Sequence, residues 1–485
     1  PSNPFLKLEP APATGRGLNP LLQNPGMIFH PPLLFLGYAG FTIPACLAFA
    51  GWITGDQFSW MRQTRNWVIF AWIALSAGII LGAWWSYMEL GWGGYWAWDP
   101  VENASLIPWL ISTAYLHTAI IGRQRRSLAR TNLFFMALSL ISCFFGTFLV
   151  RSNVIDSLHS FGSKGIGMPL LWLMFLALGL TFFLMLTGKA KSRALDDPVS
   201  KSGLILLFSS IFIILSLIVV LGTMWPVISR LWTSNTMGLD AGFYNRVCLP
   251  LFVFMSLLLC FCPWLKWKKG VADNKYFLLV VSIFFLSLIV LWSGGVKQIL
   301  PLLGAGSAIT ICLSIVLLFV RFKSLRRQRI YWGIYGVHLG IALIVLGVAF
   351  SGPYKQEKEA ILTLNKKISI KNYEVRYIDF QEKITPGIAI YEARLEVYKN
   401  GQKIGELFPQ KRMYRKFDQP FAEVSVLPSP GDEIYATLLG FDENKTISLK
   451  ISVNPLVNWI WIGGTVLCLF GFLAMRVSGQ GVDEQ

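Results

Sequence analysis

The sequence is poor in charge and lacks several signatures of soluble enzymes. Only 14% of its 485 residues are Asp, Glu, Lys or Arg, whereas 54% are hydrophobic. A soluble protein of this length needs no such apolar excess. The chain has no internal repeat, and it contains neither G-x-G-x-x-G nor a P-loop pattern, so it carries no nucleotide-binding fingerprint. The composition therefore places the chain in a membrane.

Cysteine and histidine are also scarce, and their placement is informative. None of the seven cysteines forms a CxxC pair, and all lie inside or at the edge of apolar runs. This argues against a disulfide or zinc framework and predicts packing roles. The cysteines are Cys46, Cys143, Cys248, Cys260, Cys262, Cys312 and Cys468, and the only histidines are His30, His117, His159 and His338.

Apolar runs of about 20 residues, the length of a transmembrane helix, recur along the chain. They predict an all-α polytopic membrane bundle of about eleven transmembrane helices. The region 276–320 is either two spans or one re-entrant turn, because Gly294, Gly295 and Pro301 interrupt it. The expected spans are 33–53, 67–88, 104–122, 131–150, 169–188, 203–224, 246–263, 276–293, 303–320, 331–350 and 456–476.

The net charge of +17 has an uneven distribution that gives an orientation. Alternate loops carry 19 Lys and Arg residues, against five in the loops between them, which is the positive-inside pattern of a multi-pass protein. It argues against a nucleic-acid partner. In a bacterial inner membrane, the segments 91–109, 151–168 and 352–455 would then face the periplasm, and the tail after Arg476 the cytoplasm.

The chain divides into four parts. Residues 1–32 form a polar, Pro-rich external segment, and 33–350 the helical bundle. Residues 352–455 have short β-rich runs, with Ala393, Leu395 and Val397 alternating with polar residues as in a half-buried strand. We expect an inserted periplasmic β-domain there, followed by a final helix and tail at 456–485.

The first residue is Pro1, with neither a methionine nor a signal peptide before the external segment. This predicts an N-terminally incomplete sequence that lacks earlier spans.

The run from Gly91 to Trp109 crowds four tryptophans and a tyrosine around three glycines and an acidic turn. An interfacial aromatic belt explains two or three such residues. It does not explain their density, or glycines that let the backbone approach a flat object. The run therefore predicts an aromatic platform for a large planar ligand.

The four histidines pair by their expected depth. His30 and His159 lie on the outer side, near the platform. His117 is six residues before Arg123 and His338 nine residues after Arg329, which puts them about 9 Å and about 13 Å from the inner boundary. A lone intramembrane histidine is usually a hydrogen-bonding helix contact. Two at similar depth suit axial ligation of one haem iron through neutral imidazoles.

The acidic turn and two cations have alternative roles. We favour helix capping over acid–base chemistry for Asp99 and Glu102, because Asp99 precedes Pro100, and Asn103 is a further candidate cap. Arg16 and Arg151 are outer-face cations that either anchor the chain at the interface or pair with carboxylates such as haem propionates.

The aromatic run resembles the WWD signature of haem-handling membrane proteins. Together with Phe29-His30-Pro31-Pro32, it resembles the CcmF-type cytochrome c haem lyases over nearly the whole chain, with departures at Tyr95 and Ala97. Members normally carry more helices before this point. The resemblance implies an outer histidine pair for substrate haem and an inner pair for a resident haem b. The matching motifs are Phe29-His30-Pro31-Pro32, Leu116-His117, Leu158-His159 and Val337-His338-Leu339.

The expected function is haem attachment to the CxxCH cysteines of apocytochrome c by thioether formation. No residue of this chain is expected to be a catalytic nucleophile. Expected partners are apocytochrome c, a periplasmic haem chaperone and other membrane subunits of cytochrome c maturation. A haem transporter or exporter and a quinone-reactive membrane oxidoreductase are the alternatives. The inner histidine pair and the β-domain favour the lyase. The substrate-haem residues expected are His30, His159, Trp92, Tyr95, Trp96, Trp98 and Asp99.

Overall fold

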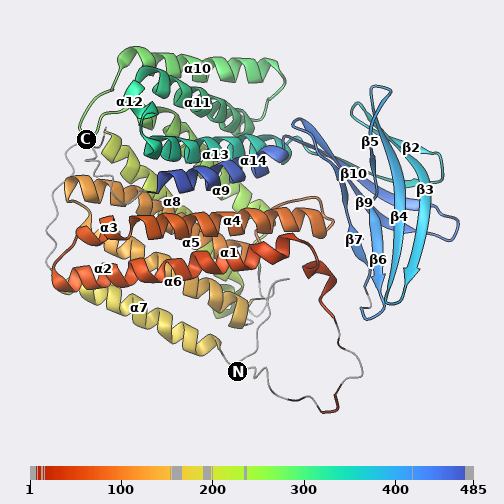
Figure 1. Ribbon diagram of the computed structural model, residues 1–485, viewed down its shortest axis with the longest axis horizontal. Helices are drawn as coiled ribbons and strands as arrows, with labels where there is room; N and C mark the ends of the chain where they lie inside the picture. The colour runs from red at the N-terminus through yellow and green to blue at the C-terminus, as the bar shows by residue number, and fades with distance from the viewer. Residues whose placement is uncertain are drawn as a thin grey trace.

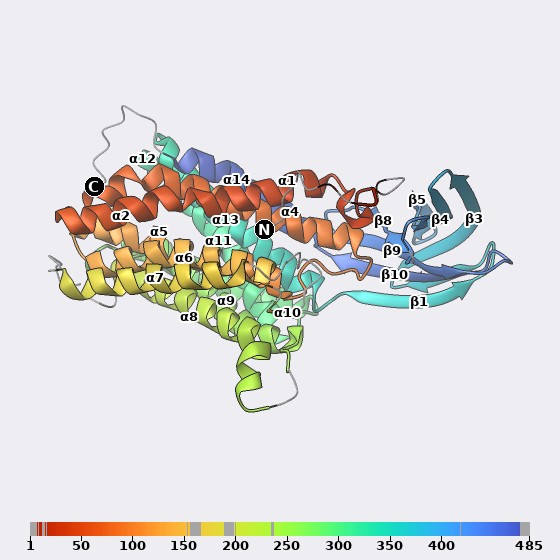
Figure 2. The ribbon, with the colours of Figure 1, turned by 90° about the horizontal axis from the view of Figure 1, so that it is seen from below.

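The computed structural model describes residues 17–152, 154–155, 166–188, 200–233, 237–417 and 419–475, with 7, 9–11, 15 and 198. The helices form a bundle, and a β-sandwich lies beyond one end of it (Figures 1 and 2). The long helices are α1 (Gly26–Gly40), α2 (Thr42–Thr54), α4 (Arg65–Glu89), α5 (Pro100–Arg125), α6 (Ala129–Ser152), α7 (Gly167–Thr187), α8 (Lys201–Ile228), α9 (Ala241–Phe261), α10 (Asn274–Ser293), α11 (Ile299–Arg321), α13 (Arg329–Ser351) and α14 (Asn458–Ala474). Short turns are η1 (Pro20–Leu22), α3 (Ser59–Gln63), η2 (Ser229–Leu231), η3 (Cys262–Trp264) and α12 (Lys323–Arg326).

The helical segments agree with the expected spans. In the described part of the chain, ten helices are long and apolar enough to cross a bilayer, with α1 and α2 together making one such segment of 29 residues. The eleventh expected span is α14, whose 17 residues lie at the lower limit for a crossing. The region 276–320 forms two separate helices, α10 and α11. All seven cysteines are unpaired, as predicted.

The first helix begins earlier than predicted, at Gly26 rather than at residue 33. Pro31 and Pro32 therefore lie inside α1, although proline usually breaks a helix. Close packing against α4 accounts for the difference: a side chain added at Gly37 would lie 2.7 Å from Leu75 Cβ. Tertiary contact thus extends the helix through the prolines and carries His30 into it.

The last helix also packs through glycine. A Cβ added at Gly340 in α13 would lie 2.6 Å from the carbonyl oxygen of Gly463 in α14, and a Cβ at Gly463 would meet Gly340 in the same way. Such small-residue contacts let helix backbones approach closely where lipid gives no hydrophobic drive to associate. They bring α14 back along α13, so both ends of the β-sandwich are tied to one helix pair.

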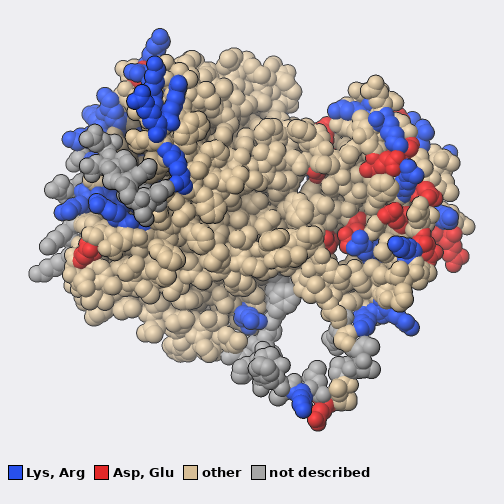
Figure 3. Space-filling view, viewed as in Figure 1, with Lys and Arg blue, Asp and Glu red and all other residues tan. Residues whose placement is uncertain are grey.

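Lys and Arg side chains gather at the bundle end farthest from the sandwich and again over the sandwich itself (Figure 3). A broad band with almost no charged side chains separates the two groups. The basic loops that the structure describes therefore lie together at one end, and the aromatic segment lies at the other, next to the sandwich (Figure 1).

The sandwich consists of two antiparallel sheets, ordered β1-β10-β9-β8 and β2-β3-β4-β6-β7, with β5 also pairing β4. Ala393, Leu395 and Val397 of β4 are fully buried in its core, as their alternation predicted. The strands are β1 (Gln356–Leu362), β2 (Lys367–Ile370), β3 (Tyr373–Thr385), β4 (Ile388–Lys399), β5 (Gln402–Leu407), β6 (Gln410–Tyr414), β7 (Phe421–Glu423), β8 (Ser425–Leu427), β9 (Asp432–Phe441) and β10 (Ile447–Pro455).

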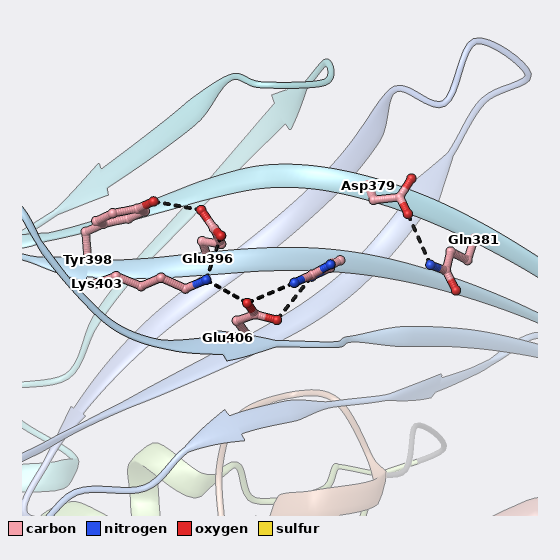
Figure 4. A network of polar contacts seen from close by, with 7 residues as sticks. Asp379, Gln381, Glu396, Tyr398, Lys403 and Glu406 are labelled. Atoms are coloured by element: carbon pink, nitrogen blue, oxygen red, sulfur yellow. Dashed lines mark hydrogen bonds and ion pairs between the residues drawn. The ribbon is translucent and has the colours of Figure 1, made fainter.

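The opposite face of β4 carries a polar network (Figure 4). Lys403 donates to Glu396 and Glu406, each at 2.6 Å, and Arg394 donates to both Glu406 oxygens. Hydrogen bonds from Arg394 and Lys403 lower the pKa of Glu406 to about 2. Exposed pairs of this kind contribute little to stability, so this face is a solvated surface.

A buried polar cluster fastens the sandwich to the bundle. The Tyr87 hydroxyl at the end of α4 donates to Glu433 of β9 at 2.5 Å, and it accepts from Asn454 of β10 at 2.6 Å. Asn458 of α14 donates to the other Glu433 oxygen at 2.8 Å. Glu433 is only 2% exposed. Side chains of α4 and α14 therefore meet on one carboxyl group of β9.

This cluster makes the stability of the protein depend on pH. Burial raises the pKa of Glu433, although the hydrogen bonds from Tyr87 and Asn458 oppose the shift. Because the pKa of Glu433 is higher in the folded state than the unfolded-state value of 4.5, this residue stabilises the folded protein below pH 4.5. Its contribution is lost as the pH rises through the folded-state pKa. Each unit of elevation is worth about 1.4 kcal/mol.

We therefore expect the melting temperature of the wild type, measured against that of Glu433→Gln, to fall as the pH rises above the unfolded value of 4.5. Scanning fluorimetry of both proteins in detergent over a pH series measures the difference, and all other titrating groups are shared. Parallel pH curves for the two proteins would contradict the assignment.

Candidate functional site

The aromatic segment Gly91–Asp99 joins α4 to α5 without helical structure. Its first half turns at Gly91 and Gly93, whose φ values are +70° and +76°. Its second half turns at Trp98, whose φ is +59°. A bulky residue in this region is an outlier that the surrounding structure must hold in place.

Contacts from α5 and α9 hold Trp98. Its ring stacks on Tyr244, with centroids 4.9 Å apart and planes 8° apart. Its indole N–H donates to Asn245 at 2.9 Å, and its carbonyl accepts from Asn103 at 3.0 Å. Trp96 meets Trp98 edge to face, at 6.0 Å and 89°. The two tryptophans are thus a fixed pair on one side of the segment, at right angles rather than coplanar.

The other two aromatic residues face different partners. The Trp92 ring covers Gly94 so closely that a Cβ there would lie 2.2 Å from the ring, and the ring remains 38% exposed. Tyr95 shares a 3.0 Å hydrogen bond with Ser351 of α13 and meets Trp461 of α14 edge on at 6.2 Å. Burial raises the pKa of Tyr95. The segment therefore presents its rings in several directions and not as one plane.

The acidic turn is a cap, as predicted. Asp99 accepts from the Val101 amide at 2.9 Å, and Glu102 accepts from the amides of Ala97 and Asp99. This capping box begins α5 at Pro100. The expectation that Asn103 is a cap was wrong. Asn103 lies within α5, 1% exposed, and bonds Trp98 and Thr223, because the helix begins three residues earlier.

Of the expected outer histidines, the structure describes His30. Its Nδ1 lies 2.6 Å from the carbonyl oxygen of Gly78 on α4, to which it donates. The imidazole rests against Gly82, where an added Cβ would lie 2.5 Å from the ring. Gly82 is therefore needed for the ring to fit. His159 and Arg16 lie outside the described residues. Arg151 is exposed at the end of α6.

The inner histidines lie side by side. The rings of His117 on α5 and His338 on α13 have centroids 6.2 Å apart and planes at 81°. Each Nδ1 donates to the carbonyl four residues earlier, Thr113 for His117 at 2.8 Å and Ile334 for His338 at 2.7 Å. This bond fixes the tautomer, so Nε2 carries the lone pair of a neutral imidazole.

The spacing fits one metal ion between two imidazoles. A metal–nitrogen bond of about 2.0 Å on each side puts the ring centroids about 6 Å apart. Among the described residues, no group of three or more His, Cys, Asp or Glu is placed to hold a metal ion. A haem iron needs only axial ligands from the protein, because the porphyrin supplies the other four nitrogens. The pair supplies the two protein ligands that a haem iron needs, and too few for a bare metal ion.

Several residues that organise the segment were not predicted. Tyr244 and Asn245 follow Asp240, which caps the start of α9. Such a cap shows where a helix begins, but it does not show which segment packs against that helix. Lys355 and Thr437 contact the glycines of the segment from the sandwich. No local sequence pattern indicates these partners.

Two family profiles match the chain. The profile described as "Cytochrome C assembly protein" covers residues 4–156, which include the aromatic segment. The profile described as "CcmF C-terminal beta-sandwich" covers residues 353–455. The helical bundle, aromatic segment and sandwich thus define a membrane protein of the cytochrome c assembly class.

Comparisons that cover nearly the whole of this chain narrow the class to one family. The chain is 34% identical to "Cytochrome c-type biogenesis protein CcmF" of Escherichia coli, over 99% of this chain and 77% of that protein. It is 31% identical to "Cytochrome c-type biogenesis protein NrfE" of Haemophilus influenzae, over 97% and 76%. A solved structure, "Cytochrome c Heme Lyase CcmF", matches with a TM-score of 0.79 and 28% identity over 93% of this chain and 72% of that one. The chain belongs to the CcmF family.

Proposed function

We propose that this protein attaches haem covalently to the CxxCH cysteines of apocytochrome c. The observation that carries the proposal is the match of nearly the whole chain, in sequence and in fold, to CcmF proteins, one of them a solved cytochrome c haem lyase. Apocytochrome c is then the substrate polypeptide. A periplasmic haem chaperone and other membrane subunits of cytochrome c maturation are the proposed partners.

The site faces the periplasm of a bacterial inner membrane in this proposal. Support comes from the separation of basic loops at one bundle end from the aromatic segment and sandwich at the other (Figure 3). The parts proposed are the external segment 1–32, the bundle 33–350, the periplasmic β-domain 352–455 and the final helix and tail 456–485.

Substrate haem binds at the aromatic segment, with His30 and His159 as iron ligands and Trp92, Tyr95, Trp96 and Trp98 as apolar contacts. Asp99 acts through the cap that starts α5 and so sets the end of the segment. Arg16 and Arg151 pair with the propionates. The edge-to-face tryptophan pair supports this role, because it offers both a ring face and a ring edge to a flat ligand.

His117 and His338 would hold a resident haem b through their Nε2 atoms. Their 6.2 Å ring separation and their fixed tautomers support this assignment. When bound, this group would supply one-electron redox chemistry for keeping the iron of the substrate haem reduced. The residues of this chain contribute two neutral nitrogen ligands and an apolar surround that includes Phe212, whose ring centroid lies 6.2 Å from that of His117.

The attachment step needs no nucleophile from the protein. Each substrate thiol adds across one haem vinyl group: sulfur bonds to one vinyl carbon, the thiol proton goes to the other, and nothing leaves. The cysteines of this chain are unpaired residues of its helical segments, and all but the exposed Cys46 are buried or half-buried, which is consistent with packing roles. Catalysis then consists mainly of holding vinyl and thiol in a reactive orientation.

Replacement of His30 tests the proposal. We expect His30→Ala to reduce covalent haem on a co-expressed apocytochrome at least about tenfold, since loss of even a residue that orients a metal ligand costs about 10- to 100-fold. Haem staining measures attachment, blotting the protein level, and a pyridine haemochrome assay the haem retained by the purified protein.

The matched control is Ile28→Ala, an exposed residue (66%) about 200° around α1 from His30, which should attach haem normally. Normal attachment by His30→Ala would contradict the role of this histidine. A wild-type protein that attaches no haem alongside its partner subunits would contradict the proposed function itself.

A further inference from the structure

Strand β9 faces two environments. Ile434, Ala436 and Leu438 lie in the sandwich core. The alternate residues Glu433, Tyr435 and Thr437 point towards the bundle and are at most 2% exposed. A face that would meet solvent in an isolated sandwich is here closed against the end of α4 and the aromatic segment.

Besides the Glu433 cluster, three contacts between the sandwich side and the bundle end on main-chain carbonyl groups. The Tyr435 hydroxyl donates to the carbonyl of Tyr87 at 3.0 Å, and the Thr437 hydroxyl to that of Gly91 at 3.3 Å. The Lys355 ammonium, from the junction between α13 and β1, donates to the carbonyl of Gly93 at 2.6 Å. Two of the three acceptors are the positive-φ glycines of the segment. The tryptophan rings take no part in these bonds.

Lys355 is itself held in place. It forms an ion pair with Glu357 of β1, and Glu357 also pairs with Lys450 at 3.3 Å and accepts from Ser452 at 3.2 Å. Burial opposes ionisation of Glu357, but the two lysines outweigh it and lower the pKa of its carboxyl. The ammonium is therefore anchored by a charged residue of the sandwich while it reaches the segment.

We propose that Lys355 and Thr437 are positioning residues through which the β-sandwich fixes the backbone of the aromatic segment and so sets the orientation in which its rings meet haem. This inference rests on the proposed function. A glycine-rich segment outside any helix has high conformational entropy. Bonds to its carbonyls restrict it without covering the rings. The sandwich thus acts on the haem site through the main chain.

The test compares Lys355→Met, Lys355→Arg and Thr437→Val in the full chain. Methionine and valine keep the approximate shape and remove the donor, whereas arginine can still donate to Gly93. The matched control is Lys358→Met: Lys358 also lies in β1 and donates to a carbonyl, that of Ser369 at 3.0 Å, but this acceptor belongs to the exposed surface of the sandwich and not to the segment. Backbone hydrogen exchange of residues 90–98 is measured, with 393–397 in the sandwich core as internal reference.

We expect exchange in 90–98 to quicken about 10- to 100-fold in Lys355→Met, the range set by loss of one hydrogen bond to a charged group. Thr437→Val should show a smaller increase, and Lys355→Arg and Lys358→Met should match the wild type. Exchange in 393–397 should not change. Covalent haem on a co-expressed apocytochrome should fall in Lys355→Met and recover in Lys355→Arg.

Unchanged exchange in 90–98 would overturn the proposal, and a fall in attachment without an exchange change would mean that Lys355 contacts haem directly. Faster exchange with normal attachment would also overturn it, because the fixed backbone would then not matter for haem. If the wild type attached no haem, the proposed function would fail, while the exchange data would still decide whether Lys355 holds the segment.

Discussion

Replacing Trp96 and Trp98 together with alanine should lower haem attachment to apocytochrome c by roughly 5- to 150-fold. Each ring face lost is worth about 0.5–1.5 kcal/mol beyond simple burial, and every 1.4 kcal/mol is about tenfold. The change also removes the stack of Trp98 on Tyr244 and the bond to Asn245. Substitution of both by phenylalanine should retain much of the activity, since a ring face remains at each position. Haem staining, normalised to protein level by blotting, measures the loss.

The control for a purely interfacial role is the double variant Trp232→Ala/Trp292→Ala. Both residues are exposed tryptophans, at 61% and 50%, near helix ends on the side of the aromatic segment. Its attachment should stay near that of the wild type. If the Trp96/Trp98 alanine variant matured cytochrome c fully, or if both double variants lost activity equally, the tryptophans would be only an aromatic belt.

Replacing either inner histidine should remove the resident haem almost completely. His117 and His338 would each supply one nitrogen ligand in the proposed site, so either substitution would remove one of the two protein ligands. We expect His117→Gly and His338→Gly to purify without the haem absorbance of the wild type. Added imidazole should restore part of it in either variant, because each glycine leaves space where a ring stood. Visible spectra and the pyridine haemochrome assay measure both effects.

Two control variants distinguish loss of an iron ligand from a general disturbance of the haem site. Phe212→Leu changes a ring that packs on His117 and should keep the haem. His30→Ala should keep it as well while attaching less haem to substrate. An unchanged spectrum in both glycine variants would exclude the inner pair as ligands. If His30→Ala lost the resident haem but still matured cytochrome c normally, the assignment of the two haem sites to the two histidine pairs would be wrong.

The sequence by itself determined the class of fold, because apolar length and charge distribution are local properties that a bilayer selects directly. The spans were located closely, and Ala393, Leu395 and Val397 were correctly assigned to the core of a β-domain. The cap at Asp99 followed from its place before Pro100. The matched depths of His117 and His338 predicted a pair that the structure places in contact. Each of these depends on residues close in sequence or on depth in the membrane.

The tertiary structure alone decided which segments meet. Pro31 and Pro32 were expected to precede the first span, but packing of Gly37 on Leu75 carries α1 through them. The stack of Trp98 on Tyr244 and the bonds from Lys355 and Thr437 to the glycines join positions far apart in the chain. Periodicity records whether a face is buried, not what buries it. In a membrane, helix partners are chosen by close contact of small residues, as between Gly340 and Gly463, and this complementarity exists only once both helices are in place.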